Sequence, residues 1–421
     1  MHAKPLKKQL DFLNWEYGMF FHFGIRSFNP GHEDWDNIEM APETFNPDKL
    51  DCNQWMKVAK EAGAKYTIMT TKHHDGFALW PSKYSNYSVA NSPWKNGKGD
   101  VVKEYVEACR ANGIKVGLYY SPAQWGKYSF NIASDKEYDD YFINQISELL
   151  SNYGKIDYLW FDGCGSQGHI YDKERIIKEI FRLQPDILTF YDADWAPGIR
   201  WVGNEDGYAP VDNWMYYDKS NFAKPVFDDG ADDYFLPSEC DCRLRSTWFY
   251  DKNEDTIKSL DELFAMYEMS VGNSANFLLN IGPDNHGLIC DADVKRLREL
   301  TEKIKSTYGN ALGYSEMEKE SENKYSVKNI TSNTFKDIFK NLANRIVLSE
   351  DLTDGQHIKE FKIYAYPPFA PESRVMIYQG TTVGHKKICM FGAIRASKYE
   401  LEITSSDGDY TLTDFKVYFA K

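Results

Sequence analysis

The chain has 421 residues, a formal net charge of −14 and an aromatic content of 15%. Its length fits two or three domains, and its 42% hydrophobic content is sufficient for a large core. The negative charge argues against a nucleic-acid partner or an anionic membrane surface, and no apolar run reaches the length of a transmembrane helix. The many aromatic rings suit the binding of sugars, although large barrels also use aromatic side chains as core filler.

Short apolar strands alternate with amphipathic helices from residue 17 to about residue 306. Strands are predicted at residues 17–23, 66–70, 115–120, 157–161, 187–191 and 276–281. Helices are predicted at residues 48–62, 100–112, 135–152, 173–183, 260–271 and 291–306. This alternation implies parallel strands joined by right-handed crossovers. The number of strands approaches eight, so residues 1–310 are predicted to form an α/β catalytic domain, a (β/α)8-type TIM barrel.

A doubly wound open sheet is the competing architecture for this region. It would favour a glycine-rich phosphate loop after the first strand, and His22-Phe-Gly-Ile-Arg is not such a loop. The stretch 195–235 is irregular, so one or two strands or helices of the barrel are expected to be degenerate there.

The pattern changes after Tyr308 to alternating strands without a helical period. Turn signals such as Asp354-Gly and Asp407-Gly separate these strands, which is typical of an antiparallel sandwich. Residues 311–421 are therefore predicted to form a C-terminal β-sandwich, an accessory domain.

The seven cysteines are scattered and odd in number, so no disulfide scaffold is expected. Cys240-x-Cys242 is one residue short of a zinc knuckle and has no second half. The start, Met1-His-Ala-Lys, lacks the apolar core of a signal peptide. The protein is therefore expected to be cytoplasmic, or to have lost a signal peptide before this sequence begins.

Polar residues at the carboxyl ends of barrel strands face the active site. The first strand ends in His22 and the second in the pair His73 and His74, while Tyr119 ends the third and Asp162 the fourth. These side chains are therefore expected to meet at one rim of the barrel.

Two chemistries use such a set of side chains. His22, His73, His74 and Asp162 could form a metal cluster, as in zinc or mononuclear hydrolases. Alternatively, imidazoles hydrogen-bond sugar hydroxyls while two carboxyl groups act on the anomeric carbon. No His-x-His spacing is present, and consecutive strand side chains point to opposite faces. We favour sugar recognition and expect neither a metal nor a cofactor.

Asp162 is the predicted nucleophile because it follows an apolar strand, which places its carboxylate at the inner rim. Gly163 lets the chain turn away and leaves that carboxylate open to a sugar. Trp160 points the same way, two residues earlier, and is expected to form the floor of the pocket. The alternative role for Asp162 is the N-cap of the next helix.

Several segments together resemble glycoside hydrolase family 29, the α-L-fucosidases. They are Tyr17-Gly-Met-Phe-Phe-His-Phe-Gly, Thr71-Lys-His-His-Asp-Gly-Phe-Ala-Leu-Trp, Gly117-Leu-Tyr-Tyr-Ser, Leu159-Trp-Phe-Asp-Gly and Asn276-Phe-Leu-Leu-Asn-Ile-Gly-Pro. The resemblance implies that Asp162 is the nucleophile and that Trp160 lies against the sugar. It also implies that four residues hold the fucose hydroxyls, namely His22, His73, His74 and Tyr119.

The segment Arg200-Trp-Val-Gly-Asn-Glu-Asp-Gly resembles the one that bears the acid/base in the subgroup acting on α-1,3/1,4-linked fucose. It nominates Glu205, with Trp201 and Tyr208 as the apolar groups that would keep its carboxyl protonated. Glu239 is the rival. Four further residues are carried over as pocket candidates, namely Glu33, Trp35, Arg245 and Trp248.

The resemblance implies a retaining exo-α-L-fucosidase that removes terminal, Lewis-type α-1,3/1,4-linked fucose from an oligosaccharide or glycoconjugate. The alternatives are an α-L-fucosidase of broad or α-1,2/1,6 preference, a metal-dependent barrel hydrolase and a non-catalytic fucose-binding protein. A fucosidase activity also suggests export to the periplasm or the outside of the cell.

Overall fold

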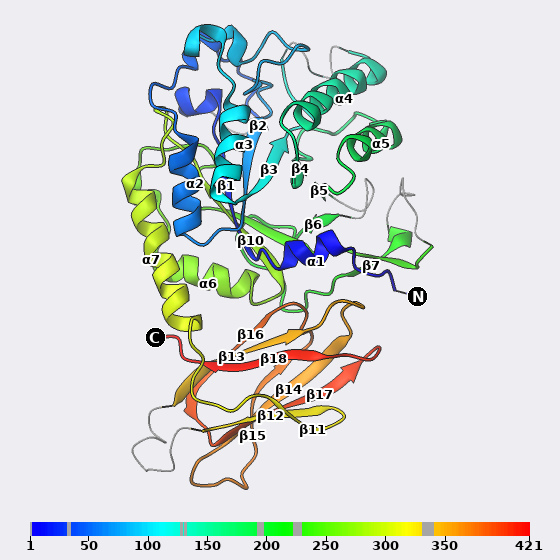
Figure 1. Cartoon of the computed structure of the whole chain (residues 1–421), viewed down its shortest axis with the longest axis vertical. Helices are drawn as coiled ribbons and strands as arrows, with labels where there is room; N and C mark the ends of the chain where they lie inside the picture. Colours follow the sequence, from blue (N-terminus) through cyan, green and yellow to red (C-terminus); the bar gives the residue numbers. More distant parts are fainter. Residues whose placement is uncertain are drawn as a thin grey trace.

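The computed structural model describes residues 2–31, 35–126, 129, 133–191, 198–221, 230–330 and 341–421. A barrel surrounded by helices occupies the upper part of the molecule, and two packed sheets lie below it (Figure 1). Among these residues, no helix has the length and apolar character needed to span a membrane.

The predicted TIM barrel is confirmed. Eight parallel strands close in the order β1-β10-β9-β6-β5-β4-β3-β2. Their bounds are β1 (Tyr17–Phe21), β2 (Tyr66–Lys72), β3 (Lys115–Tyr120), β4 (Tyr158–Phe161), β5 (Leu188–Tyr191), β6 (Ile199–Trp201), β9 (Ser238–Arg243) and β10 (Ala275–Ile281). Every residue of β1, β2, β4 and β10 is buried, as expected for strands covered on both faces.

The helices are α1 (Lys7–Leu13), α2 (Cys52–Glu61), α3 (Val101–Asn112), α4 (Asp135–Asn152), α5 (Lys173–Leu183), α6 (Leu260–Ser270) and α7 (Asp291–Tyr308). Five of them begin at a residue whose side chain accepts a backbone N–H of the first turn, namely Asp51, Asp100, Ser134, Asp172 and Ser259. Asp172 caps α5, the helix that follows β4, so the N-cap alternative for Asp162 is wrong.

The irregular stretch between β5 and β9 departs most from the regular repeat. β6 has only three residues and pairs directly with β9, and the described residues between them hold no α-helix. They hold instead a hairpin of β7 (Tyr216–Asp218) and β8 (Asp233–Phe235). The chain after β6 is therefore free to run across the mouth of the barrel.

The predicted C-terminal sandwich is also confirmed, with antiparallel sheets in the orders β11-β12-β17-β14-β15 and β16-β13-β18. Its strands are β11 (Glu318–Ser321), β12 (Lys324–Lys328), β13 (Leu342–Glu350), β14 (Ile358–Tyr366), β15 (Val375–Gly380), β16 (Lys387–Arg395), β17 (Lys398–Ser406) and β18 (Leu412–Tyr418). Their inner faces form a core of their own, which includes Ile346, Phe361 and Tyr399.

Buried polar contacts join the sandwich to the barrel. Glu268 of α6 is 4% exposed and accepts hydrogen bonds from Arg345 of β13, at 2.7 Å from Nε and 3.1 Å from Nη2. Lys387 of β16 donates to the carbonyl of Val211 at 2.6 Å and to Oδ1 of Asn273 at 3.0 Å. The sandwich therefore contacts the chain that follows β6.

We expect Glu268→Ala to lower the free energy of unfolding by about 2 kcal/mol, because it leaves the partly buried Arg345 guanidinium without its carboxylate. Urea unfolding at neutral pH measures this change. Lys7→Ala is the matched control, since it removes an ion pair with Asp11 that is exposed to solvent. Equal free energies of unfolding for the two variants would contradict a stabilising role of this interdomain pair.

Candidate active site

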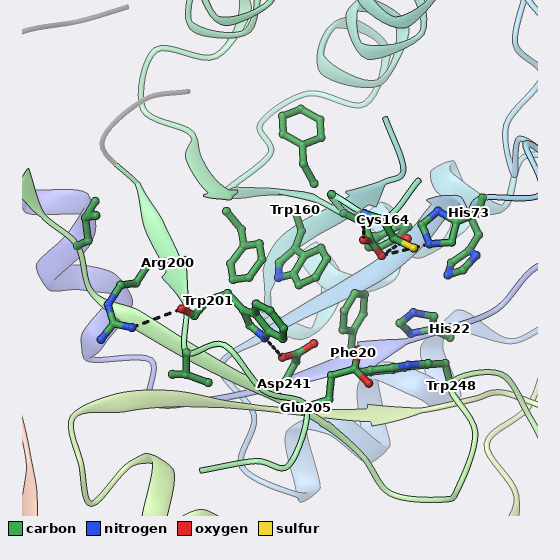
Figure 2. Close-up of a pocket in the computed structure, with 18 of the residues that line it drawn as sticks. Phe20, His22, His73, Trp160, Cys164, Arg200, Trp201, Glu205, Asp241 and Trp248 are labelled. Carbon is green, nitrogen blue, oxygen red and sulfur yellow. Dashed lines mark hydrogen bonds and ion pairs between the residues drawn. The ribbon is translucent and has the colours of Figure 1, made fainter. Parts of the chain in front are cut away.

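The carboxyl ends of the barrel strands open onto a cavity of about 780 Å³. Side chains from β1 to β6, from β9 and from the loop after β6 line it (Figure 2). Nine of the residues nominated from the sequence lie on its wall, namely His22, His73, His74, Tyr119, Trp160, Asp162, Trp201, Glu205 and Trp248.

Asp162 follows β4 and its carboxylate is held by hydrogen bonds. Oδ2 accepts from the Tyr119 hydroxyl at 2.9 Å and lies 3.4 Å from Nε2 of His74. Oδ1 accepts from the backbone N–H of Cys164 at 2.9 Å. Burial raises the pKa of Asp162, but the contact with His74 and these two hydrogen bonds outweigh it and lower the pKa to about 2. Asp162 is therefore ionised at neutral pH, as a nucleophile requires.

The three histidines do not all carry the same charge at neutral pH. Burial lowers the pKa of His74, but its hydrogen bond to Asp162 outweighs burial and raises the pKa to about 9. Burial lowers the pKa of His22 to about 3 and that of His73 well below its usual value. His74 is therefore the cationic partner of Asp162, whereas His22 and His73 are neutral imidazoles that can donate to, or accept from, sugar hydroxyls.

Neighbouring side chains orient the two neutral histidines. Nδ1 of His22 lies 2.7 Å from Oδ1 of Asn280, at the end of β10. The ring of His73 stacks on Tyr119 at a centroid distance of 5.5 Å and an interplanar angle of 11°. Trp248 covers His22 at 4.9 Å. These contacts leave one side of the imidazole pair facing the cavity.

His73, His74 and Asp162 also bring three ligand atoms within 4.8 Å of one another, close enough to hold a metal ion. However, Nδ1 of His74 lies 2.6 Å from the Ser121 hydroxyl and Nε2 is paired with Asp162. With both ring nitrogens engaged, His74 has no free lone pair to offer a metal. The donor set therefore fits hydrogen bonding to a sugar better than metal ligation.

We expect prolonged dialysis against a chelator to leave kcat/KM for an aryl fucoside unchanged, because hydrogen bonding of these side chains to a sugar needs no metal. Elemental analysis of the dialysed protein is the control. A loss of activity that added Zn²⁺ or Mn²⁺ restores would contradict the sugar-recognition interpretation of this cluster.

Trp160 forms an aromatic floor. Its ring stacks on Phe190 at 4.1 Å with an interplanar angle of 7°, and on Tyr119 at 5.4 Å and 24°. Its indole N–H donates to Oε1 of Glu239 at 3.0 Å. Trp160 therefore presents an aromatic surface to the cavity that Asp162 also lines.

Glu239 lies inside the barrel, away from the cavity wall. It is 1% exposed and accepts hydrogen bonds from Tyr66, from Tyr158 at 3.1 Å and from Trp160. Burial raises its pKa to about 7 although these donors oppose the shift. With its oxygens occupied by these donors, Glu239 supports Trp160 and is not among the described residues that line the cavity.

Glu205 lies on the loop after β6 and lines the cavity. Its side chain is 46% exposed, and Oε2 lies 3.8 Å from Nη2 of Arg243. Trp201 and Tyr208, the expected apolar neighbours of Glu205, are themselves 44% and 42% exposed, so these two side chains do not enclose its carboxyl group. Another group must therefore keep Glu205 protonated if it is the general acid.

Arg245 and Trp35 are not among the described residues that line the cavity. Arg245 pairs with Asp293 at 3.0 Å and donates to the Asp251 carbonyl, so it anchors the loop from which Trp248 projects. Trp35 packs against His74, with the two ring centroids 5.1 Å apart. Glu33 lies outside the described residues.

Sequence reasoning missed Asp241, which lines the cavity from β9 beside Glu205. The sequence Ser-Glu-Cys-Asp-Cys-Arg does not resemble a buried strand, so β9 was not predicted. Its alternation was the available signal, since Glu239, Asp241 and Arg243 fall on one face of a strand.

A closed (β/α)8 barrel with an aromatic floor, neutral imidazoles and several carboxyl groups at one mouth defines a sugar-cleaving enzyme of the glycoside hydrolase class. Residues 3–310 match the α-L-fucosidase family. The chain belongs to this family, glycoside hydrolase family 29, and its activity is that of an α-L-fucosidase.

Relatives support this membership over the full chain. α-L-Fucosidase 1 of Arabidopsis thaliana is 32% identical over 448 residues, covering 97% of this chain and 87% of the plant protein. A glycoside hydrolase family 29 member from an unknown rumen bacterium is 30% identical with a TM-score of 0.88, covering 100% of this chain and 78% of that chain. A Ruminococcus gnavus family 29 fucosidase, solved in complex with fucose, is 25% identical with a TM-score of 0.85, covering 100% and 96%.

Proposed function

We propose that this α-L-fucosidase is a retaining exo-enzyme that works by double displacement, with Asp162 as nucleophile and Glu205 as acid/base. The observation that carries the proposal is the ionised Asp162 carboxylate, held at the cavity wall by His74 and Tyr119 beside the Trp160 floor. A carboxylate fixed in this way is suited to attack an anomeric carbon.

In the first step, an oxygen of Asp162 forms a bond to the anomeric carbon while the bond to the leaving oxygen breaks. Glu205 transfers its proton to that oxygen, which departs as an alcohol. In the second step, Glu205 takes a proton from water, whose oxygen displaces Asp162 and releases fucose. The configuration is inverted twice and therefore retained. This scheme requires the two carboxyl groups to lie about 5–5.5 Å apart in the substrate complex.

We further propose a preference for terminal α-1,3/1,4-linked fucose of the Lewis type. The resemblance around Glu205 supports it, as does the exposure of Trp201, which leaves an aromatic face beside the leaving-group side of the cavity. An aglycone that carries a second branch would contact that face.

Release of free fucose from matched Lewis-type, 2′-linked and core α-1,6-fucosylated glycans tests this preference. We expect kcat/KM to be at least about tenfold higher for the Lewis-type glycans, a difference of about 1.4 kcal/mol in transition-state binding. Equal values across the three glycans would contradict the linkage preference and leave the fucosidase activity untouched.

We also propose, on the substrate class alone, that the protein acts in the periplasm or outside the cell. Fractionation of the producing cells with cytoplasmic and periplasmic marker enzymes tests the location. Activity found only with the cytoplasmic marker would contradict it.

A further inference from the structure

Asp241 is a carboxyl group in the active-site cavity that the mechanism above does not use. It lies on β9 and is 5% exposed, yet it lines the cavity together with Glu205. The indole N–H of Trp201 donates to Oδ1 of Asp241 at 2.7 Å. Figure 2 shows this bond directly beside Glu205.

The backbone brings the Glu205 loop onto β9. Asp206 forms an antiparallel bridge with Cys242, so the loop runs alongside the strand that carries Asp241 and Arg243. Glu205 therefore interacts with two groups of this strand: its charge acts on the carboxyl of Asp241, and its Oε2 lies 3.8 Å from Nη2 of Arg243.

Besides Glu205, the groups that interact with Asp241 through charge include carboxyl, phenol and thiol groups. Glu239 and Tyr158 lie below it in the barrel, and Cys240 and Cys242 are its neighbours on the strand. Burial raises the pKa of Asp241 to about 8; the Trp201 N–H opposes this rise, while the charges of Glu205 and Glu239 add to it. Two carboxyl groups that line one cavity and interact through their charges do not both ionise readily.

We propose that Asp241 and Glu205 share one proton in the free enzyme, so that Asp241 is the positioning residue that supplies Glu205 with the proton it gives to the leaving group. When a substrate oxygen faces Glu205, the shared proton sits on Glu205. Asp241 then carries the negative charge, which the Trp201 N–H stabilises. Arg243 stabilises the Glu205 carboxylate after proton transfer. This inference rests on the assignment of Glu205 as the acid/base.

The pH dependence of kcat/KM for a fucosylated oligosaccharide tests this pairing in Asp241→Asn. Without the neighbouring negative charge Glu205 loses its proton more easily, so the alkaline limb of the profile moves to lower pH by about one unit or more. Activity near pH 7 falls about tenfold on the oligosaccharide and much less on an activated aryl fucoside, whose leaving group needs little protonation.

Arg243→Gln is the matched variant, and we expect it to shift the alkaline limb of the pH profile in the opposite direction. Removing the positive charge makes Glu205 hold its proton more tightly, so the alkaline limb moves to higher pH. A structural disturbance of the loop would move both variants in the same direction.

A second measurement does not depend on replacing Asp241. The indole N–H resonance of Trp201, assigned by its loss in Trp201→Phe, reports the ionisation of the carboxyl group it contacts. We expect this resonance to titrate with pH, and its midpoint to fall by about one unit in Glu205→Gln, because the charge opposing ionisation of Asp241 is gone.

An unmoved alkaline limb in Asp241→Asn, or a Trp201 resonance that does not respond to Glu205→Gln, overturns the inference. If Glu205→Ala still loses activity selectively on oligosaccharides, the proposed function stands without it. If Asp241→Asn loses oligosaccharide activity selectively and Glu205→Ala does not, Asp241 is itself the acid, and both the inference and the Glu205 assignment fail.

Discussion

Replacing Asp162 with alanine should lower kcat/KM for every fucoside by about 10⁴-fold or more, because no covalent intermediate can form. The loss should be equally severe for good and poor leaving groups, since the missing bond is the one to the anomeric carbon. Steady-state kinetics with an activated aryl fucoside and a natural oligosaccharide measures it. Near-normal turnover on either substrate would contradict the role of Asp162.

A second variant, Asp162→Asn, separates the negative charge of Asp162 from the shape of its side chain. Asp162→Asn keeps the shape of the side chain, and therefore the contact with the Cys164 N–H, but removes the negative charge. We expect the same loss of activity from it. Added azide should react with the activated fucoside in the Asp162→Ala cavity and give a product of inverted configuration, because only one displacement then occurs.

Glu205→Ala, unlike Asp162→Ala, should affect substrates with good and poor leaving groups to different extents. An activated aryl leaving group departs without protonation, so the first step on that substrate should slow by no more than about tenfold. A natural oligosaccharide should lose about 10²–10⁴-fold, the usual contribution of a general acid. The ratio of the two losses, measured under identical conditions, is the decisive quantity.

Glu239→Gln is the matched control, because the rival carboxyl group acts through the Trp160 floor. Its effect should be similar on both substrates, since a displaced floor weakens the binding of fucose itself. Equal losses for Glu205→Ala on the two substrates would show that another residue is the acid. A selective loss for Glu239→Gln would point to Glu239.

Much of the fold and half of the site could be predicted from the sequence. The strands that end in His22, His73 and Asp162 are apolar runs bounded by helices with clear caps, so the pattern places their last residues at the barrel rim. Packing against neighbouring strands then brings those side chains together, which is why Asp162 and the histidines could be predicted to share one cavity.

The leaving-group side could not be predicted in the same way. β6 has three residues and β9 is a polar sequence, so neither has the hydrophobic pattern of a barrel strand. The neighbours of Glu205 are set by the bridge between Asp206 and Cys242, a tertiary contact without a local signal. The sequence also did not distinguish Glu239 from Asp241, because both lie on the same face of β9. Only the packing inside the barrel puts Glu239 beneath Trp160 and Asp241 on the cavity wall.

Trapping the covalent intermediate tests the central claim most directly. A fluorinated fucosyl fluoride, in which an electron-withdrawing fluorine slows both steps and a good leaving group restores the first, should inactivate the enzyme. We expect peptide mass spectrometry to find the fluorofucosyl group as an ester on Asp162. A label on Glu205, Glu239 or Asp241, or turnover without a label and with inverted configuration, would contradict it.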